Sequence, residues 1–139
     1  MHSTLEKILM LKGTPLFSTV AAEDLSALAR TAEERSFAAG QDIVREGESG
    51  DELFVILSGR VAVHRAGAEV TTLGPGEAFG EISVLDAGPR TATVTAEAAT
   101  DVLAVTSEEF YEILYEQAEI AEGVIRMLVK RLRDASRGG

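Results

Sequence analysis

The sequence contains no cysteine. This absence excludes a disulfide scaffold, a thiolate metal site and a cysteine nucleophile, and it fits the cytoplasmic location that we expect. Histidine is nearly as scarce. We expect His2 to be a mobile terminal residue, and His64 to face solvent or a groove from a predicted strand. Because a metal-dependent β-barrel enzyme needs closely spaced histidines, we expect neither a metal nor a cofactor.

The motifs of common enzyme classes are also missing. The chain has no Gly-x-Ser-x-Gly elbow, no His-Glu-x-x-His and no Walker-type lysine loop. Carboxylates are abundant, as at Glu46, Glu48, Asp51 and Glu52, and this pattern is typical of solvated turns. A catalytic carboxylate pair stays open as an alternative, but the sequence favours a binding protein over an enzyme.

Positive charge and long apolar runs are in short supply. The chain has 13 Lys and Arg against 23 Asp and Glu, a formal net charge of −10. Such a field repels nucleic acid and anionic membranes, and no room for a helix-turn-helix follows the last apolar helix, so we expect no direct DNA binding. We also expect no signal peptide and no membrane segment. An anionic ligand therefore needs a local positive site.

The length of 139 residues and the 45% hydrophobic content predict a single domain over residues 1–139. It divides into N-terminal helices over 1–34, a β-rich part over 35–105 and C-terminal helices over 106–139. In the first part, an amphipathic turn stops at a glycine and a proline, and a second helix is predicted from about residue 22 to 34.

The β-rich part consists of short apolar runs separated by glycines. This spacing predicts a mainly β fold, an antiparallel jelly-roll-like β-barrel with flanking helices. The clearest predicted strands are 52–57, 60–66, 70–73, 90–96 and 101–105.

The C-terminal part begins with a predicted capping box. In it the Thr106 side chain accepts from the backbone N–H of Glu109, and the Glu109 side chain reaches back to the backbone of Thr106. A last helix follows over about 118–135, and its apolar residues recur at helical spacing. This stripe is core, a dimer seam or a lid that closes over a ligand. The lid candidates are Met127, Leu128 and Arg131.

One stretch, "FGEISVLDAGPRTATVTA" over residues 79–96, contains the groups that a cyclic nucleotide requires. An arginine fork pairs with phosphate oxygens, backbone N–H groups at a helix start cradle the same anion, and a carboxylate accepts a ribose hydroxyl. The residues that offer these groups are Gly80, Glu81, Ile82, Ser83 and Arg90. On chemistry alone, a structural salt bridge between Glu81 and Arg90 is an equally open interpretation.

The same stretch resembles the phosphate-binding cassette of the cyclic nucleotide-binding domain family. That family includes the bacterial catabolite activator, the regulatory subunits of cyclic-AMP-dependent protein kinase and cyclic-nucleotide-gated channels. Its pattern runs Phe-Gly-Glu, a small apolar helix, a variable loop, then Arg, a small residue, Ala and a β-branched strand. Two further blocks, "GDELFVILSGRVAV" and "LGPGEAFGE", resemble the family as well, so the resemblance covers nearly the whole chain.

The resemblance implies a role for each residue of the cassette. Glu81 would accept the ribose 2′-hydroxyl, and Arg90 would pair with the cyclic phosphate. Gly80 and Ile82 would direct backbone donors at the ligand. The other residues implied are Thr91 and Ala92 at the pocket border, and Phe79 and Val94 in the core.

The resemblance also implies the ligand and the output. We expect cyclic AMP, and Thr91 keeps cyclic GMP open because its hydroxyl can bond a guanine amino group. The implied function is a sensor that converts ligand binding into movement of its C-terminal helices. The alternative is a nucleotide-free interaction or dimerisation domain on the same barrel. Expected partners are a second copy through the last helix and an unknown effector protein or fused domain.

Overall fold

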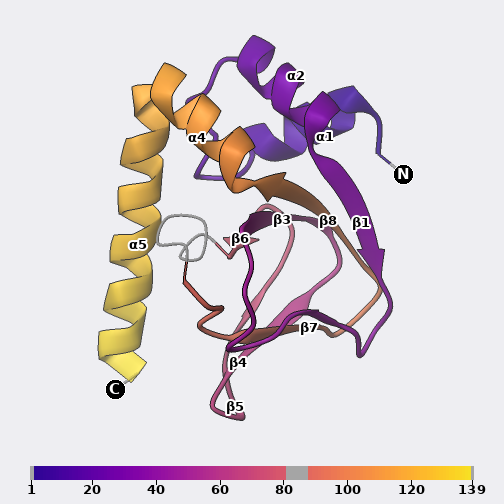
Figure 1. The fold of residues 1–139 in the computed structure, drawn as a ribbon, viewed down its shortest axis with the longest axis vertical. Coiled ribbons are helices and arrows are strands. Elements are labelled where there is room, and N and C mark those ends of the chain that lie inside the picture. The colour runs from indigo at the N-terminus through magenta and orange to yellow at the C-terminus, as the bar shows by residue number, and fades with distance from the viewer. Residues whose placement is uncertain (1, 81–87, 139) are drawn as a thin grey trace.

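The computed structural model describes residues 2–80 and 88–138, and the element labels are those of Figure 1. The described strands form two four-stranded antiparallel sheets, and helices cover one side of them (Figure 1). The strands are β1 (Glu33–Phe37), β2 (Asp42–Val44), β3 (Glu52–Ser58), β4 (Val61–Arg65), β5 (Ala68–Leu73), β6 (Ala78–Phe79), β7 (Thr93–Ala96) and β8 (Thr100–Thr106).

The chain passes repeatedly from one sheet to the other. One sheet has the order β1-β8-β3-β6 and the other β2-β7-β4-β5. Side chains from both sheets share one apolar cluster, which the structure places between them. This arrangement confirms the predicted antiparallel, jelly-roll-like barrel with flanking helices.

The helices in the described part of the chain are α1 (Thr4–Lys12), α2 (Ala22–Thr31), α4 (Ser107–Glu116) and α5 (Ala118–Gly138). The predicted capping box of α4 is confirmed: the Glu109 N–H donates to Thr106 Oγ1 at 3.1 Å, and Glu109 accepts from the Thr106 N–H at 2.9 Å. Ser3 and Glu6 form the same box at the start of α1. Both boxes satisfy backbone donors that a helix start leaves unpaired. None of the described helices is long and apolar enough to cross a membrane.

Strand β3 separates two apolar cores. Leu53, Val55 and Leu57 face a cluster built with α1, α2, α4 and α5, which we call the helical core. Phe54 and Ile56 face the cluster between the sheets, which we call the barrel core. All five side chains are at most 2% exposed, because a strand covered on both faces buries both sets of alternating residues.

Two predicted boundaries were wrong. The second helix ends at Thr31 rather than near Glu34, because residues 33–37 pair with β8 and become strand β1. The strand predicted over 90–96 begins at Thr93, because the backbone of Arg90 pairs instead with the segment 47–48. In both places a tertiary hydrogen-bond partner overrides the local pattern.

The apolar residues of α5 lie on two faces of the helix. Ile120 and Val124 are buried in the helical core. Gly123 lies so close to the backbone of Leu16 that a Cβ there would stand 3.0 Å from the Leu16 carbonyl oxygen. On the other face, Ile125, Val129 and Leu132 are exposed. The face that holds Ile120 and Val124 is therefore core, and a second apolar face of α5 is open.

The expectation of a mobile His2 was wrong. Its backbone N–H donates to Glu34 Oε1 at 2.9 Å, and its Nδ1 lies 3.0 Å from Glu34 Oε2. The other histidine, His64, is half-buried on β4.

Candidate functional site

Arg90 is positioned by backbone hydrogen bonds to the loop between β2 and β3. The Arg90 N–H donates to the Glu48 carbonyl at 2.8 Å, and the Arg90 carbonyl accepts from the Gly47 N–H at 2.9 Å. Ser49 and Pro89 form an isolated antiparallel bridge beside them. The residue is only 7% exposed. These backbone hydrogen bonds place the Arg90 side chain on the interior side of the barrel wall.

The Arg90 guanidinium rests on the backbone and on an aromatic ring. Its Nη1 donates to the Glu52 carbonyl at 2.9 Å and to the Gly80 carbonyl at 3.4 Å. Its Cζ lies 5.6 Å from the centroid of the Phe54 ring, within cation–π range. Burying a charge without such partners costs free energy, so these contacts fix the position of the Arg90 guanidinium.

Two glycines make room for this guanidinium. A Cβ on Gly50 would lie 2.3 Å from Arg90 Nε, and a Cβ on Gly80 would lie 2.8 Å from Arg90 Nη1. Gly80 also has φ +90°, a conformation that other residues rarely adopt. The site therefore requires glycine at both positions.

A second arginine supports the same wall. Arg35 on β1 forms a bidentate pair with the Glu52 carboxylate, at 2.9 and 2.6 Å. Its Cζ lies 6.0 Å from the centroid of Phe54. Hydrogen bonds to Glu52, and then to Glu33, raise the pKa of Arg35. Glu52 therefore holds Arg35 with its side chain and Arg90 with its carbonyl.

The remaining predicted site residues fall into three groups. Thr91 is exposed, and its carbonyl accepts from Arg65 Nε at 3.3 Å. Ala92 is buried beside it. Phe79 and Val94 lie in the barrel core, as predicted. Glu81, Ile82 and Ser83 lie outside the described residues.

The three lid candidates do not share one environment. Met127 and Leu128 are half-buried and pack against the helical core. Arg131 donates from Nη2 to the carbonyl of Ala78, which lies on β6 two residues before Gly80. Arg131 is thus the candidate that connects α5 directly to the strand leading into the cassette.

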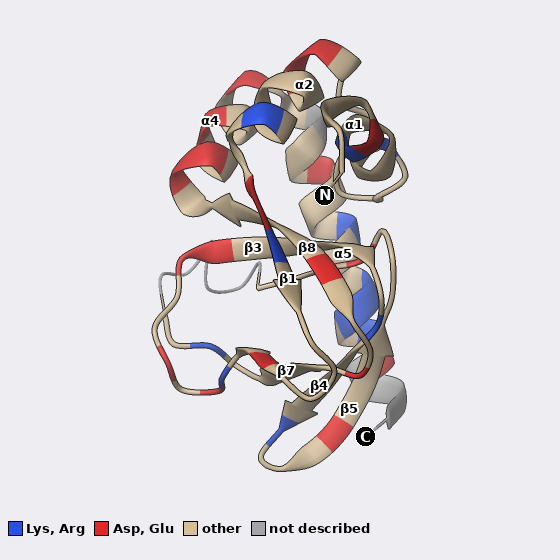
Figure 2. Cartoon of the chain, turned by 90° about the vertical axis from the view of Figure 1, so that its right-hand side faces the viewer, with Lys and Arg blue, Asp and Glu red and all other residues tan. Residues whose placement is uncertain are grey.

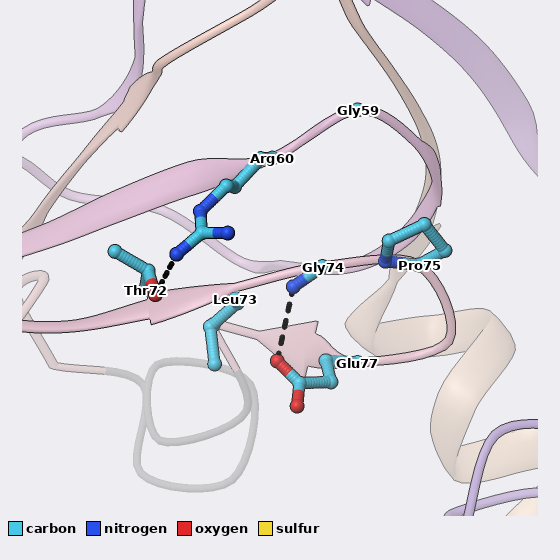
Figure 3. A pocket seen from close by; sticks show the side chains of 7 residues that line it. All are labelled: Gly59, Arg60, Thr72, Leu73, Gly74, Pro75 and Glu77. Carbon is cyan, nitrogen blue, oxygen red and sulfur yellow. Dashed lines mark hydrogen bonds between the residues drawn. The ribbon is translucent and has the colours of Figure 1, made fainter.

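A separate pocket of about 230 Å³ opens beside the turn between β3 and β4 (Figure 3). In it Arg60 donates to Thr72 at 3.0 Å, and Glu77 accepts from the Gly74 N–H at 3.1 Å. Arg60 also pairs with Glu97 at 3.3 Å. The side chains of Arg60, Thr72 and Glu77 in this pocket thus bond to the protein itself, and Arg90 does not line the pocket.

Sequence reasoning missed the supporting residues of the site. Arg35, Gly50 and Phe54 were not proposed as site residues, and Glu52 was grouped with solvated acids. The signal was present in the "GDELF" block, which was identified as a predicted strand and a family block but was given no role in the site. Only strand pairing between β1, β8 and β3 shows that Arg35 reaches Glu52.

Comparison with known proteins identifies the class. The model of the cyclic nucleotide-binding domain family matches residues 34–117. This is more than half of the chain, so the chain belongs to that family.

Individual relatives agree. The chain is 35% identical to the cyclic AMP receptor protein of Thermus thermophilus over 90% of this chain and 60% of that protein. A cGMP-dependent protein kinase of Eimeria tenella is 48% identical over 48% of this chain and 7% of its own length. The regulatory domain of Toxoplasma gondii PKA, solved with cAMP, superposes with a TM-score of 0.73 at 31% identity, covering 79% and 44% of the two chains. The chain therefore spans about 60% of the length of the first of these curated relatives.

Proposed function

We propose that this protein binds cyclic AMP through Arg90, with Gly80, Thr91 and Ala92 at the border of the pocket. One observation supports the proposal most. The guanidinium of Arg90 is nearly buried and donates to backbone carbonyls, in a chain whose net charge is −10. Arginine has five donors in a fixed plane, and that geometry suits phosphate oxygens. The roles proposed for Glu81, Ile82 and Ser83 come from the family pattern.

The choice of base is a finer part of the proposal. The names of the cyclic AMP receptor protein and the PKA domain solved with cAMP favour cyclic AMP. Thr91 and the cGMP-dependent kinase relative make cyclic GMP the second ligand to test. Thr91 is exposed, so its hydroxyl is accessible to a ligand.

We propose that the output is a shift of α5. The bond from Arg131 to the Ala78 carbonyl joins that helix to β6, next to Gly80. A ligand that favours one position of α5 shifts the population by its differential affinity, typically about 1–3 kcal/mol. A fused domain or separate effector would then respond.

The exposed apolar face of α5 favours a second function, dimerisation. Ile125, Val129 and Leu132 are 61%, 42% and 68% exposed and recur at helical spacing. We propose that a second copy covers them, with or without nucleotide. Sedimentation of the wild type and of Ile125→Glu tests this: the variant should be monomeric at concentrations where the wild type is a dimer.

Isothermal titration of cyclic AMP into wild type, Arg90→Ala and Arg60→Ala tests ligand binding. We expect wild type and Arg60→Ala to bind alike, because Arg60 lies in the separate pocket of Figure 3. Arg90→Ala should bind at least about 100-fold more weakly, since it loses charge-assisted bonds worth about 1.5–3 kcal/mol each. If neither nucleotide binds or thermally stabilises the wild type, the binding proposal is wrong. That result would favour the alternative of a nucleotide-free interaction domain.

A second titration tests the base. Thr91→Ala should lower the affinity for cyclic GMP by about tenfold, about the size of one hydrogen bond, and change that for cyclic AMP less. Thr71→Ala, on an exposed strand position, is the matched control. Equal losses for the two nucleotides would remove Thr91 as a selectivity residue.

A further inference from the structure

Three metal-ligating side chains meet on the sheet face that the helices partly cover. The ligand atoms of His2, Glu34 and Asp101 all lie within 4.8 Å of one another. The residues come from the N-terminal segment, from β1 and from β8. Arg90 and its supporting residues are not members of this group.

Strand register explains the two carboxylates. Glu34 pairs with Leu103, and Ser36 with Asp101, in the antiparallel β1–β8 ladder. Glu34 and Asp101 are therefore diagonal neighbours on one face, at a distance that side chains can bridge. That face is the helix-facing one, because Leu103 belongs to the helical core.

The capping box of α1 brings the histidine to this face. Ser3 caps α1, so the chain direction just before the helix is set. His2 then lies beside the start of β1, where its backbone N–H donates to Glu34. Its side chain is 16% exposed, and that of Glu34 is 9% exposed. The imidazole is thus held, half-buried, against a carboxylate.

The carboxylates of the cluster both accept hydrogen bonds. Burial raises the pKa of Glu34, but hydrogen bonds from the backbone and ring of His2 outweigh it, and the pKa is lowered. A hydrogen bond from Ser36, helped by one from Ser58, lowers the pKa of Asp101.

We propose that His2, Glu34 and Asp101 form a binding site for a transition-metal dication such as Zn²⁺. One imidazole nitrogen with two carboxylate oxygens is a donor set that Zn²⁺ accepts, with water as a fourth ligand. Ca²⁺ and Mg²⁺ prefer oxygen donors alone. In a tetrahedral zinc site the ligand atoms stand about 3.3 Å apart. The His2 Nδ1–Glu34 Oε2 distance of 3.0 Å is already close to this value, and the remaining ligand atoms, which lie within 4.8 Å, would move in by up to about 1.5 Å.

The surroundings of the cluster suit this role. Ser36 and Ser58 donate to the two oxygens of Asp101 at 2.7 and 3.2 Å, and such outer hydrogen bonds orient metal-ligating carboxylates. The Glu34 oxygen nearest to the imidazole is Oε2, while Oε1 accepts the His2 N–H and lies 3.9 Å from Lys7 Nζ. Oε2 would therefore be the Glu34 ligand. His2 Nδ1 would release its proton to solvent and exchange its hydrogen bond with Oε2 for the metal, while Oε1 would keep its contact with Lys7.

The proposal departs from the expectation of no metal, which treated His2 as an isolated mobile residue. It also gives the site a consequence. A metal held by these three residues links the segment before α1 to β1 and β8, and binding to the folded state alone stabilises that state.

The experiment is a titration of Zn²⁺ into the full chain, purified without a polyhistidine tag, followed by calorimetry and by thermal unfolding. We expect one Zn²⁺ per chain and a higher midpoint of unfolding. His2→Ala and Asp101→Asn should each weaken binding at least about tenfold. The matched control is His64→Ala, which removes the only other histidine and should bind like wild type.

Several results would overturn the proposal: no saturable Zn²⁺ binding, equal binding by wild type and His2→Ala, or a loss caused equally by His64→Ala. Mg²⁺ at the same concentrations should produce no shift of the midpoint, and an equal shift would refute the nitrogen-dependent site. Circular dichroism of each variant without metal shows that it folds. His2→Ala removes only a terminal contact, so it remains informative if Asp101→Asn unfolds.

Discussion

The two faces of β3 are built differently. On the inner face, Phe54 and Ile56 lie between the two sheets, and backbone hydrogen bonds join the strands of each sheet. On the outer face, Leu53, Val55 and Leu57 meet helices that are held mainly by side-chain packing. The arginine of the proposed site belongs to the inner face, through Phe54. The helix proposed to move, α5, belongs to the outer one.

This difference indicates which half is suited to each task. A strand ladder fixes many backbone positions at once, so the barrel can hold the Arg90 fork in one place. Packed helices can shift against a sheet without breaking backbone hydrogen bonds. Figure 2 shows that α5 also carries Lys and Arg residues. One residue of this helix, Arg131, donates to the carbonyl of Ala78 on β6. That bond is a direct connection from the movable half to the fixed half.

The largest expected effect is on the inner face. Gly50→Ala would place a Cβ 2.3 Å from Arg90 Nε, so the guanidinium must leave its position. Overpacking of this kind costs about 1–3 kcal/mol of stability. We expect cyclic AMP affinity to fall about 100-fold, measured by calorimetry, because the fork no longer meets the phosphate.

Gly74→Ala is the control for this substitution. A Cβ there meets nothing within 4 Å, and the residue does not have a positive φ. We expect unchanged affinity. If Gly50→Ala binds as well as Gly74→Ala does, the position of Arg90 on the inner face is not what binding requires.

A matched pair of phenylalanines separates the two faces. Phe54 and Phe110 are 2% and 1% exposed, one in each core. Replacing either by Leu should cost about 1 kcal/mol of unfolding free energy, measured with urea. Only Phe54→Leu should weaken nucleotide binding, by a few fold, because the ring also supports the guanidinium groups of Arg35 and Arg90. Equal binding losses would show that the faces are not independent.

The smallest effect is expected from the connection between the faces. Arg131→Met keeps an apolar stem but removes the donor to Ala78. Amide hydrogen exchange in the second half of α5 should become about three- to tenfold faster, as expected from the loss of about 1 kcal/mol. Arg133→Met, at an exposed position of the same helix, should exchange like wild type. Unchanged exchange in both variants would remove Arg131 as the link.

Local signals were sufficient for much of the fold. Glycine-separated apolar runs predicted the barrel, and the Thr106–Glu109 capping box predicted the start of α4, because caps and turns depend on neighbouring residues. The same reasoning placed Glu33 and Glu34 in a helix. It failed there because the pairing partner of β1 is β8, about seventy residues further along the chain.

The candidate site shows the same division. The stretch from residue 79 to 96 singled out Arg90 by its chemistry and by family resemblance. Gly80, one of the residues that hold its guanidinium, belongs to this stretch, but Glu52 and Phe54 are far away in sequence. Glu52 acts through a carbonyl that every residue possesses. No pattern of side chains can reveal such a contact.

The sequence by itself determined the class of this protein, since composition, turn spacing and one cassette are local properties of the chain. Tertiary structure decided where the charges stand. It placed Arg90 over Phe54 and brought His2 to Glu34 and Asp101, because both arrangements depend on strand register between segments distant in the chain. Strand register depends on pairing across the whole sheet, so local sequence patterns do not predict it.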